Sequence, residues 1–294
     1  MVRIRKRTIG TETYYYLEHS LREGSKVEKK ELYLGKALPH NIQEITLNFI
    51  REFYTQKWHD SIVQIKQQYA QSLKNMPKSL VQKELNSFMI KFTYDTQKIE
   101  GSTLTLRETA QLLDDNITPK EKPTRDVKEA EAHKAIFYEM LKYPKELSLG
   151  VILNWHRKLF IATKPDIAGK IRKTGVAIAG SKFLPPTPIE IDLLLQDFFI
   201  WYKQHNAKIP PVELAALVHL RIVTIHPFND GNGRMSRLLM NFVLHKHQYP
   251  LLDIPYEHRS GYYRALERSQ LTKNEFIFVQ WFMARYIKEQ QRYN

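Results

Sequence analysis

The chain has 294 residues, 43% of them hydrophobic, and contains no cysteine. This length and apolar content suit a globular protein with a sizeable core. The lack of cysteine excludes disulfides, thiolate metal sites and thiol nucleophiles. A formal net charge of +14 invites an acidic or nucleic-acid partner. No apolar run has the length of a membrane span, so we expect a cytoplasmic protein without membrane contact.

The first segment, assigned to residues 1–38, predicts a small β-hairpin. Within it, two stretches rich in aromatic and aliphatic residues flank a polar turn that contains Gly24 and Ser25. A dense basic cluster precedes the hairpin and consists of Arg3, Arg5, Lys6 and Arg7. This cluster fits either a phosphate-binding patch or a mobile terminus. Elsewhere the basic residues alternate with acidic ones, as on solvated helix faces, so nucleic acid is not the favoured partner.

Beyond Pro39 the sequence predicts a mainly α-helical protein, divided into residues 39–124 and a core of residues 125–294. One long helix follows Pro39 as far as about Leu73, and a second follows Pro77 as far as Ile99. Further helices are expected over 104–113, after Pro123, around His156, over 189–204 and over 211–223. Residues 176–188 instead predict an exposed β-hairpin, because β-branched and small residues surround Gly180 and prolines follow.

The stretch HPFNDGNGRMSR, from His226 to Arg237, lies between two apolar helical segments and so forms a helix–loop–helix junction. Loop residues supported by two packed helices are well placed for chemistry. Gly231 and Gly233 let the backbone approach a ligand closely, and free N–H groups at the start of a helix attract anions. These features predict a phosphate-binding loop.

The polar side chains of the same stretch fit a nucleotide. Arg234 and Arg237 share a helix face and can bind two successive phosphates, while Asn232 can donate its amide to the same oxygens. Asp230 is a single carboxylate beside them, an arrangement suited to a Mg²⁺ that also contacts phosphate oxygens and water.

At the other end of the loop, a neutral His226 imidazole can accept the proton of an attacking hydroxyl. Phe228 is interpreted as the hydrophobic anchor of the loop. Taken singly, a capping histidine, turn glycines and surface arginines would each be unremarkable. Their combination within twelve positions favours an active site.

HPFNDGNGRMSR resembles the motif of the Fic family. The resemblance implies a Fic-type helical bundle with a β-hairpin flap, with His226 as base and Asp230 holding Mg²⁺. It further implies that the GNG backbone binds the α and β phosphates, and that Arg234 and Arg237 serve the β and γ phosphates. The expected reaction transfers AMP from ATP to Ser, Thr or Tyr hydroxyls of a protein, itself included. The intact GNGR argues against the kinase-like Doc branch.

Two further segments resemble parts of the same family. The stretch AGKIRKTGVAIAG with Arg172 leads into a flap-like segment that would dock a target's backbone. The docking residues of this flap would be Val176, Ala177, Ile178, Phe183 and Leu184. The stretch GYYRALERSQ nominates Tyr262, Tyr263 and Gln270 as base or ribose contacts, although such aromatics also occur in ordinary cores. Family members often form homodimers.

Thr96 to Gly101, with the sequence TQKIEG, resembles the family's inhibitory motif. Thr96 and Glu100 lie one helical turn apart on one face, and Gly101 can end the helix beside them. The resemblance implies that Glu100 pairs with Arg237 and takes the position that the γ phosphate needs. The alternative is an exposed glutamate at a helix end, without a regulatory role.

The sequence therefore predicts an autoinhibited protein adenylyltransferase that uses ATP and Mg²⁺. Three alternatives stay open. The same site could remove AMP from a modified protein, or it could transfer a different nucleoside monophosphate. The chain could instead be a nucleotide-sensing or DNA-associated regulator that binds through its basic N-terminal segment.

Overall fold

The computed structural model describes residues 2–23 and 26–293, with no description of the side chains of residues 21–26. The chain divides into two compact units, Met1–Val63 and Gln64–Asn294, and the long helix α1 (Ile42–Asn75) contains the boundary. This helix was predicted from Pro39 to about Leu73, and the structure confirms it. The boundaries predicted after residues 38 and 124 stay predictions.

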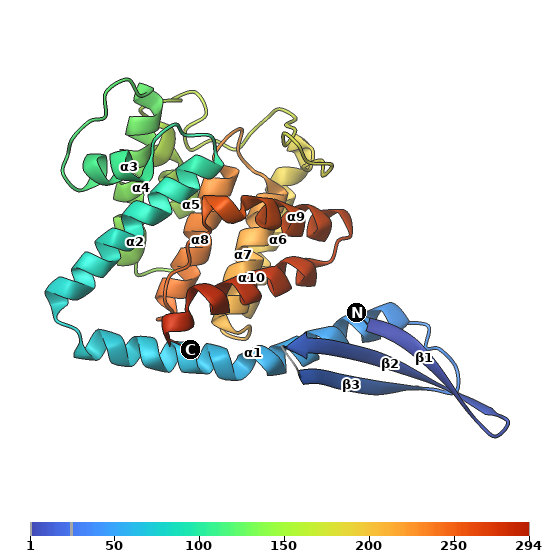
Figure 1. Ribbon diagram of the computed structural model, residues 1–294. Helices are drawn as coiled ribbons and strands as arrows, with labels where there is room; N and C mark the ends of the chain where they lie inside the picture. The colour runs from blue at the N-terminus through green and yellow to red at the C-terminus, as the bar shows by residue number, and fades with distance from the viewer. Residues whose placement is uncertain (1, 24–25, 294) are drawn as a thin grey trace. The chain divides into compact units, whose positions relative to one another are not determined.

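The first unit contains a three-stranded antiparallel sheet in the order β1-β2-β3, shown in blue in Figure 1. Its strands are β1 (Val2–Ile9), β2 (Glu12–Glu23) and β3 (Lys26–Gly35). The two strands of the predicted hairpin are confirmed as β2 and β3, while the turn at Gly24 and Ser25 lies outside the described residues.

Strand β1 corrects the interpretation of the basic cluster as a mobile terminus. Arg3 and Arg5 donate to the carboxylate of the buried Glu18 on β2, at 3.0 and 2.6 Å. In the antiparallel register Arg3 lies opposite Glu18 and Arg5 opposite Tyr16, so alternate residues of β1 share the face that carries this carboxylate. Cross-strand charge pairing therefore makes an ordered strand out of residues that look like a basic tail.

The second unit is helical, as the mainly α prediction required. Its helices after α1 are α2 (Lys78–Ile99), α3 (Leu106–Leu113), α4 (Thr124–Lys142), α5 (Leu149–Phe160), α6 (Pro188–His205), α7 (Pro211–Ile225), α8 (Asn232–Lys246), α9 (Arg259–Leu271) and α10 (Glu275–Glu289). Short 3₁₀ helices η1 (Tyr256–His258) and η2 (Gln291–Tyr293) flank the last two. Among the described residues, no helix combines the length and apolar character needed to cross a bilayer.

Local sequence signals explain where several helices begin and end. Thr105 and Glu108 form a reciprocal capping box at the start of α3, and the Ser148 hydroxyl caps α5. Helix α2 ends at Ile99, and Gly101 follows with a φ of 91°, a conformation that glycine adopts without strain. The predicted stop at Gly101 is therefore confirmed, and it leaves Glu100 at the end of the helix.

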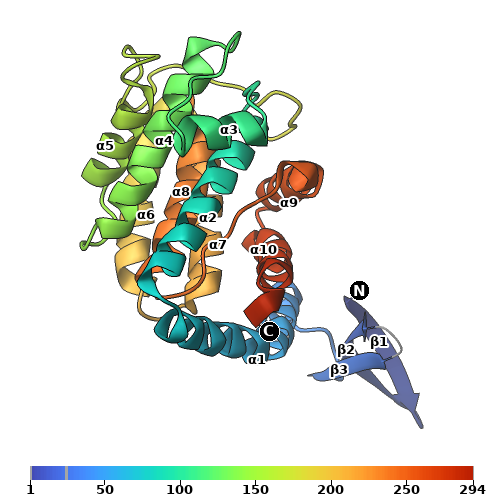
Figure 2. The same ribbon diagram turned by 60° about the vertical axis from the view of Figure 1, so that its left-hand side comes forward.

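Helices α7 and α8 pack against each other at the centre of the second unit (Figures 1 and 2). Helix α8 also packs on α2, α4 and α5, while α7 packs on α6 and α10. Their facing side chains are fully buried and include Leu214, Val218, Leu239, Met240 and Val243. The loop that joins α7 to α8 is therefore anchored on two helices that burial holds in place.

The segment between α5 and α6 contains the predicted flap. Its chain turns at Ala179 and Gly180, where the Ser181 amide donates to the Ile178 carbonyl at 3.1 Å. The predicted turn is confirmed, but the two arms do not pair as strands anywhere in the described part of this segment. Pro185 and Pro186 lack the N–H groups that a ladder requires, which explains why the second arm stays irregular.

Candidate active site

The loop between α7 and α8 is shaped by two left-handed residues and one buried ring. His226 has a φ of 52° and Gly231 a φ of 81°, so the chain reverses sharply at both ends of the loop. Between them Phe228 is buried and stacks on the His156 ring, with centroids 3.8 Å apart and planes 9° from parallel. Phe228 is the hydrophobic anchor that the sequence predicted.

Asn232 departs from its predicted role as a phosphate ligand. Its side-chain oxygen accepts from the Phe228 amide at 2.9 Å, and its amide donates to the Phe228 carbonyl at 2.8 Å. The residue is buried. The Asn232 side chain therefore braces the loop, because both of its ends are engaged within the loop itself.

His156 on α5 is a loop-supporting residue that sequence reasoning missed. Its Nδ1 accepts from the Gly169 amide at 2.9 Å, so its Nε2 donates to the Asp230 carbonyl at 3.0 Å. Burial lowers the pKa of His156 to about 4, so the ring is neutral at physiological pH. His156 and Asp230 are 74 positions apart in the chain, so no local signal connects them.

His226 has the geometry of a general base. Its Nδ1 lies 3.1 Å from the Val223 carbonyl and donates to it, which leaves the Nε2 lone pair free among the described residues. Burial lowers the pKa of His226 below its ordinary value of 6.5, so the neutral form dominates near pH 7. The side chain lines a cavity of about 390 Å³.

That cavity brings together eight of the eighteen site residues predicted from the sequence. It is lined from α7 and α8 by His226, Gly233 and Arg237, from the end of α2 by Glu100, from the flap by Ile178, Ala179, Gly180 and Ser181, and from α9 by Tyr262, Tyr263, Glu267 and Gln270. The candidate base, the glycine-rich helix start, one arginine, the glutamate of the predicted inhibitory motif and the flap therefore meet at one place.

Arg237 is buried, and each of its three guanidinium nitrogens donates at least one hydrogen bond. Its Nη2 donates to Glu100 Oε1 at 2.6 Å, and the exposed fractions of the two side chains are 1% and 27%. The Thr96 hydroxyl and carbonyl accept two further bonds at 3.3 Å each. A Cβ added at Gly233 would lie less than 3.0 Å from the Glu100 carboxylate. The structure thus contains the predicted Glu100–Arg237 ion pair, packed directly on Gly233.

Arg234 does not share this environment, contrary to the prediction that both arginines serve phosphates from one face. Its Nη1 donates to the carboxylate of Glu129, and its Nη2 donates to Asp230 Oδ1 at 2.9 Å. The guanidinium also lies 4.6 Å from the centre of the Phe160 ring. Arg234 is buried away from the cavity lining, so here it holds Asp230 in position through charge-assisted bonds.

Asp230 is a partly exposed carboxylate with fixed orientation. Its Oδ1 accepts from the Gly231 amide at 2.5 Å and from Arg234, while its Oδ2 pairs with the Lys164 ammonium. Burial would raise the pKa of Asp230, but Arg234 and Lys164 outweigh it and lower the pKa, so the group is ionised.

A metal at Asp230 would depend on ligands from outside the protein. The described residues contain no group of three or more His, Cys, Asp or Glu side chains arranged to hold a metal. One carboxylate is nevertheless a fitting ligand for Mg²⁺, which usually keeps several waters and binds substrate phosphates. The donor set therefore suits a Mg²⁺ that is bound jointly with a nucleotide.

Arg172 connects the flap to the loop, a role that the sequence did not indicate. From its buried position it donates to the His226 carbonyl at 2.7 Å, to the Thr174 carbonyl at 2.9 Å and to the Pro186 carbonyl at 2.5 Å. On α9, Glu267 accepts from the Lys182 amide at 2.5 Å. Both arms of the flap are thus tied to the site.

The five predicted docking residues differ in exposure. Leu184 has 77% of its surface exposed and Ala177 is also exposed, which leaves both free to contact another molecule. Val176, Ile178 and Phe183 are half-buried, and Ile178 faces the cavity.

The three α9 residues predicted to contact the base or ribose have distinct surroundings. Tyr262 is buried, and its hydroxyl lies 2.9 Å from His219 Nε2 and 3.3 Å from Arg237 Nη1, so it braces the arginine. The Tyr263 hydroxyl donates to the Ile99 carbonyl at 3.3 Å. Of the three, Tyr263 is the most exposed, with 45% of its surface accessible, so its aromatic ring is the better candidate for stacking on a base.

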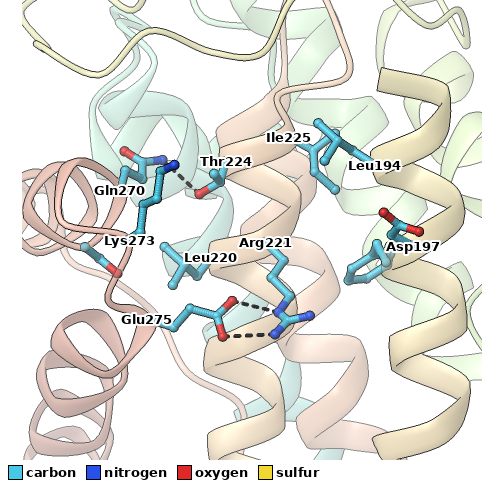
Figure 3. A pocket seen from close by; sticks show the side chains of 11 residues that line it. Leu194, Asp197, Leu220, Arg221, Thr224, Ile225, Gln270, Lys273 and Glu275 are labelled. Atoms are coloured by element: carbon cyan, nitrogen blue, oxygen red, sulfur yellow. Dashed lines mark hydrogen bonds and ion pairs between the residues drawn. The ribbon is translucent and has the colours of Figure 1, made fainter. Parts of the chain in front are cut away.

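Gln270 lies in the wall between the active-site cavity and a second cavity of about 390 Å³ between α6, α7 and α9 (Figure 3). Its amide donates to the Thr224 hydroxyl at 3.1 Å. Figure 3 also shows Arg221 paired with Glu275 at the rim of the second cavity, at 2.8 Å.

Comparison with known proteins agrees with this geometry. Residues 146–244 match the model described as the Fic/DOC family. The chain carries a Fic domain. The chain is also 37% identical over 184 residues to the protein adenylyltransferase Fic of Drosophila ananassae, in an alignment that covers 59% of this chain and 35% of the relative. The chain thus spans about a third of the length of the curated relatives it matches.

Solved Fic structures have the same fold. A Fic domain containing signaling protein from Bacteroides thetaiotaomicron aligns with a TM-score of 0.71 and 28% identity, over 79% of this chain and 94% of that one. Fic-1 from Caenorhabditis elegans, residues 134–508, aligns with a TM-score of 0.70 and 26% identity, over 87% and 77% of the two chains. The Fic fold therefore extends well beyond residues 146–244.

Proposed function

We propose that this Fic protein transfers AMP from Mg²⁺-ATP to a hydroxyl group of a protein, and that Glu100 restrains the reaction. The observation that carries the proposal is the meeting of Glu100 and Arg237 in the cavity that also contains His226 and Gly233. The curated relatives carry the name protein adenylyltransferase, which supports this reaction over phosphoryl transfer.

In the proposed reaction, the acceptor hydroxyl oxygen bonds to the α-phosphorus of ATP and loses its proton to His226 Nε2. The bond from the α-phosphorus to the α,β-bridging oxygen breaks, and pyrophosphate leaves with that electron pair. The backbone at Gly231 to Gly233, at the start of α8, would hold the phosphates because a helix N-terminus favours anions. Mg²⁺ held by Asp230 would neutralise charge on the phosphates.

Glu100 would restrain this reaction through Arg237. A γ phosphate needs donors, and the buried guanidinium gives its shortest bond to the Glu100 carboxylate. The carboxylate also packs on Gly233, where its negative charge would repel a phosphate bound at the same helix start. Removing this side chain would free both the arginine and the helix start.

The test compares ATP labelled at the α phosphate with ATP labelled at the γ phosphate, using wild type and Glu100→Gly. We expect only the α label to enter protein, with more label in the variant. Intact mass after incubation with ATP, GTP, CTP and UTP identifies the transferred group. Incorporation of the γ label would contradict the proposal. So would the absence of any mass increase with all four nucleotides.

A second reaction has one specific observation in its favour. The Glu100 carboxylate is 27% exposed and shares the cavity with His226, so it could orient a water molecule toward a bound phosphodiester. The enzyme would then remove AMP from a modified protein. Release of AMP from a pre-modified target that is lost in Glu100→Gly would favour removal over transfer.

Several predictions from the sequence remain to be tested beside these reactions. They are self-modification, a homodimer, a cytoplasmic location and nucleic-acid binding by the N-terminal unit. The pairing of Arg3 and Arg5 with Glu18 speaks against the last, because these cations already have an acidic partner.

A further inference from the structure

Lys164 lies outside every motif of the sequence, yet its ammonium pairs with the carboxylate of Asp230. It follows α5, and its amide donates to the Phe160 carbonyl at 2.7 Å while its carbonyl accepts from the Ala168 amide at 3.1 Å. Its ammonium is 5.1 Å from the centre of the Phe160 ring. The Lys164 side chain is 28% exposed, and the residue is held by its backbone bonds and by the contacts of its ammonium.

The Lys164 ammonium sits on the one oxygen of Asp230 that is left for a metal. Oδ1 of Asp230 is already bonded to the Gly231 amide and to Arg234. Oδ2 has the Lys164 ammonium as its partner, and the same ammonium lies 3.7 Å from Glu129 Oε1. A cation of the protein therefore stands where a divalent cation would bind.

We propose that Lys164 keeps divalent cations away from Asp230 until a nucleotide arrives. The inference rests on the proposed function in one respect, namely that Asp230 is the metal ligand. Without nucleotide, a divalent ion would gain one protein oxygen and would face the charges of Lys164 and Arg234 at short range. The metal therefore binds weakly to the free enzyme.

Nucleotide phosphates reverse this balance. They supply further oxygen ligands for the metal and a new acceptor for the displaced ammonium, and their negative charge offsets that of the cations. The species that Asp230 accepts is then a complex of a divalent cation with a nucleotide, and not the free cation. Lys164 thereby acts as a positioning residue that orders the binding of metal and nucleotide.

The test measures Mn²⁺ binding by the loss of free-ion EPR signal, without nucleotide and with saturating ADP. Without nucleotide, Lys164→Met should bind Mn²⁺ about tenfold more tightly than wild type, because the variant lacks one positive charge beside the divalent ion. With ADP the two proteins should differ by less than about threefold, by the same Coulomb argument. Adding Asp230→Asn to Lys164→Met should abolish the gain.

Two controls separate charge from packing. Lys164→Arg keeps the positive charge and should bind Mn²⁺ as wild type does. Lys170→Met removes an exposed lysine later in the same segment, whose ammonium donates to the Asp166 carbonyl, and it should leave Mn²⁺ binding unchanged. If far-UV circular dichroism shows that Lys164→Met is unfolded, Lys164→Gln takes its place, and the same Mn²⁺ affinities are expected with and without ADP.

Equal or weaker Mn²⁺ binding by the charge-removing variant would overturn the inference, as would a gain that survives Asp230→Asn. The readout is separate from catalysis. If the α-label experiment fails while Lys164→Met gains Mn²⁺ affinity, the proposed transfer falls and the role of Lys164 stands. If the α label enters protein but the Mn²⁺ affinity of Lys164→Met equals that of wild type, the proposed transfer stands and the role of Lys164 falls.

Discussion

The two ends of the HPFNDGNGRMSR stretch are held in different ways. At the loop end, the Asn232 side chain bonds to the Phe228 backbone, the Asp230 carbonyl accepts from the neutral His156, and Phe228 stacks on the same ring, so these contacts lie within the protein itself. At the helix end, the partners of Arg237 include Glu100 and Thr96 from α2. Contacts within the protein therefore shape the loop, whereas we propose that the arginine exchanges its carboxylate partner for a phosphate.

The largest expected effect tests whether the loop carries the chemistry. In the Glu100→Gly background, His226→Ala should lower the rate of AMP transfer about 1000-fold, because the neutral base is lost. Radiolabel incorporation from α-labelled ATP measures it. His59→Ala, an exposed histidine of α1, is the control. A rate within about tenfold of the parent would mean that another group accepts the proton.

A glycine pair tests whether the loop end is the rigid one. An alanine at Gly231 would combine a φ of 81° with a Cβ less than 3.0 Å from the Phe160 ring, so we expect a loss of about 3 kcal/mol in unfolding free energy. Gly101 has a φ of 91° but open space around it, so Gly101→Ala should cost about 1 kcal/mol. Urea denaturation measures both, and equal losses would refute the difference in packing.

The pH dependence of the reaction sharpens the assignment of His226. Burial lowers the pKa of this histidine, and the base must be neutral, so kcat/KM should be constant near pH 7 and fall only as the pH drops below 6.5. Glu100 is one of the groups that raise the pKa of His226, so in Glu100→Gly the decrease in kcat/KM should occur at a lower pH than in wild type. A midpoint above 6.5 in that variant would contradict the assignment.

The smallest expected effect concerns the brace behind Arg237. In the Glu100→Gly background, Tyr262→Phe removes hydroxyl contacts to Arg237 and His219, and should weaken ATP binding about fivefold, the value of roughly one hydrogen bond. Tyr263→Phe removes only the bond to the Ile99 carbonyl and should change the affinity little. Calorimetry measures both, and an unchanged affinity of Tyr262→Phe would show that Arg237 needs no brace.

Features that depend on neighbouring residues could be predicted from the sequence. Apolar spacing located the helices from α1 to α8 but not α9 and α10, and Gly101 marked the end of α2. The contiguous stretch from His226 to Arg237 carried its own chemistry, and the resemblance to the family supplied the partner of Arg237.

Features that depend on distant residues could not be predicted. Three of the arrangements that were missed join Arg234 to Glu129, His156 to Asp230 and Lys164 to Asp230, across 105, 74 and 66 positions. Spacing gives no information on such pairs. It also suggested that Arg234 and Arg237 act alike, although packing against α4 gives Arg234 a carboxylate partner of its own. Strand β1 was missed because its arginines resemble a basic tail until their partner Glu18 is known.

The central claim is that Glu100 and a nucleotide phosphate compete for Arg237. The most direct measurement is the initial rate of α-label incorporation by Glu100→Gly relative to wild type, with the exposed loop variant Glu121→Gly as control. Loss of a charge-assisted bond predicts a rate at least about tenfold higher than that of wild type, with the control unchanged. A Glu100→Gly rate equal to or below that of wild type would contradict the claim.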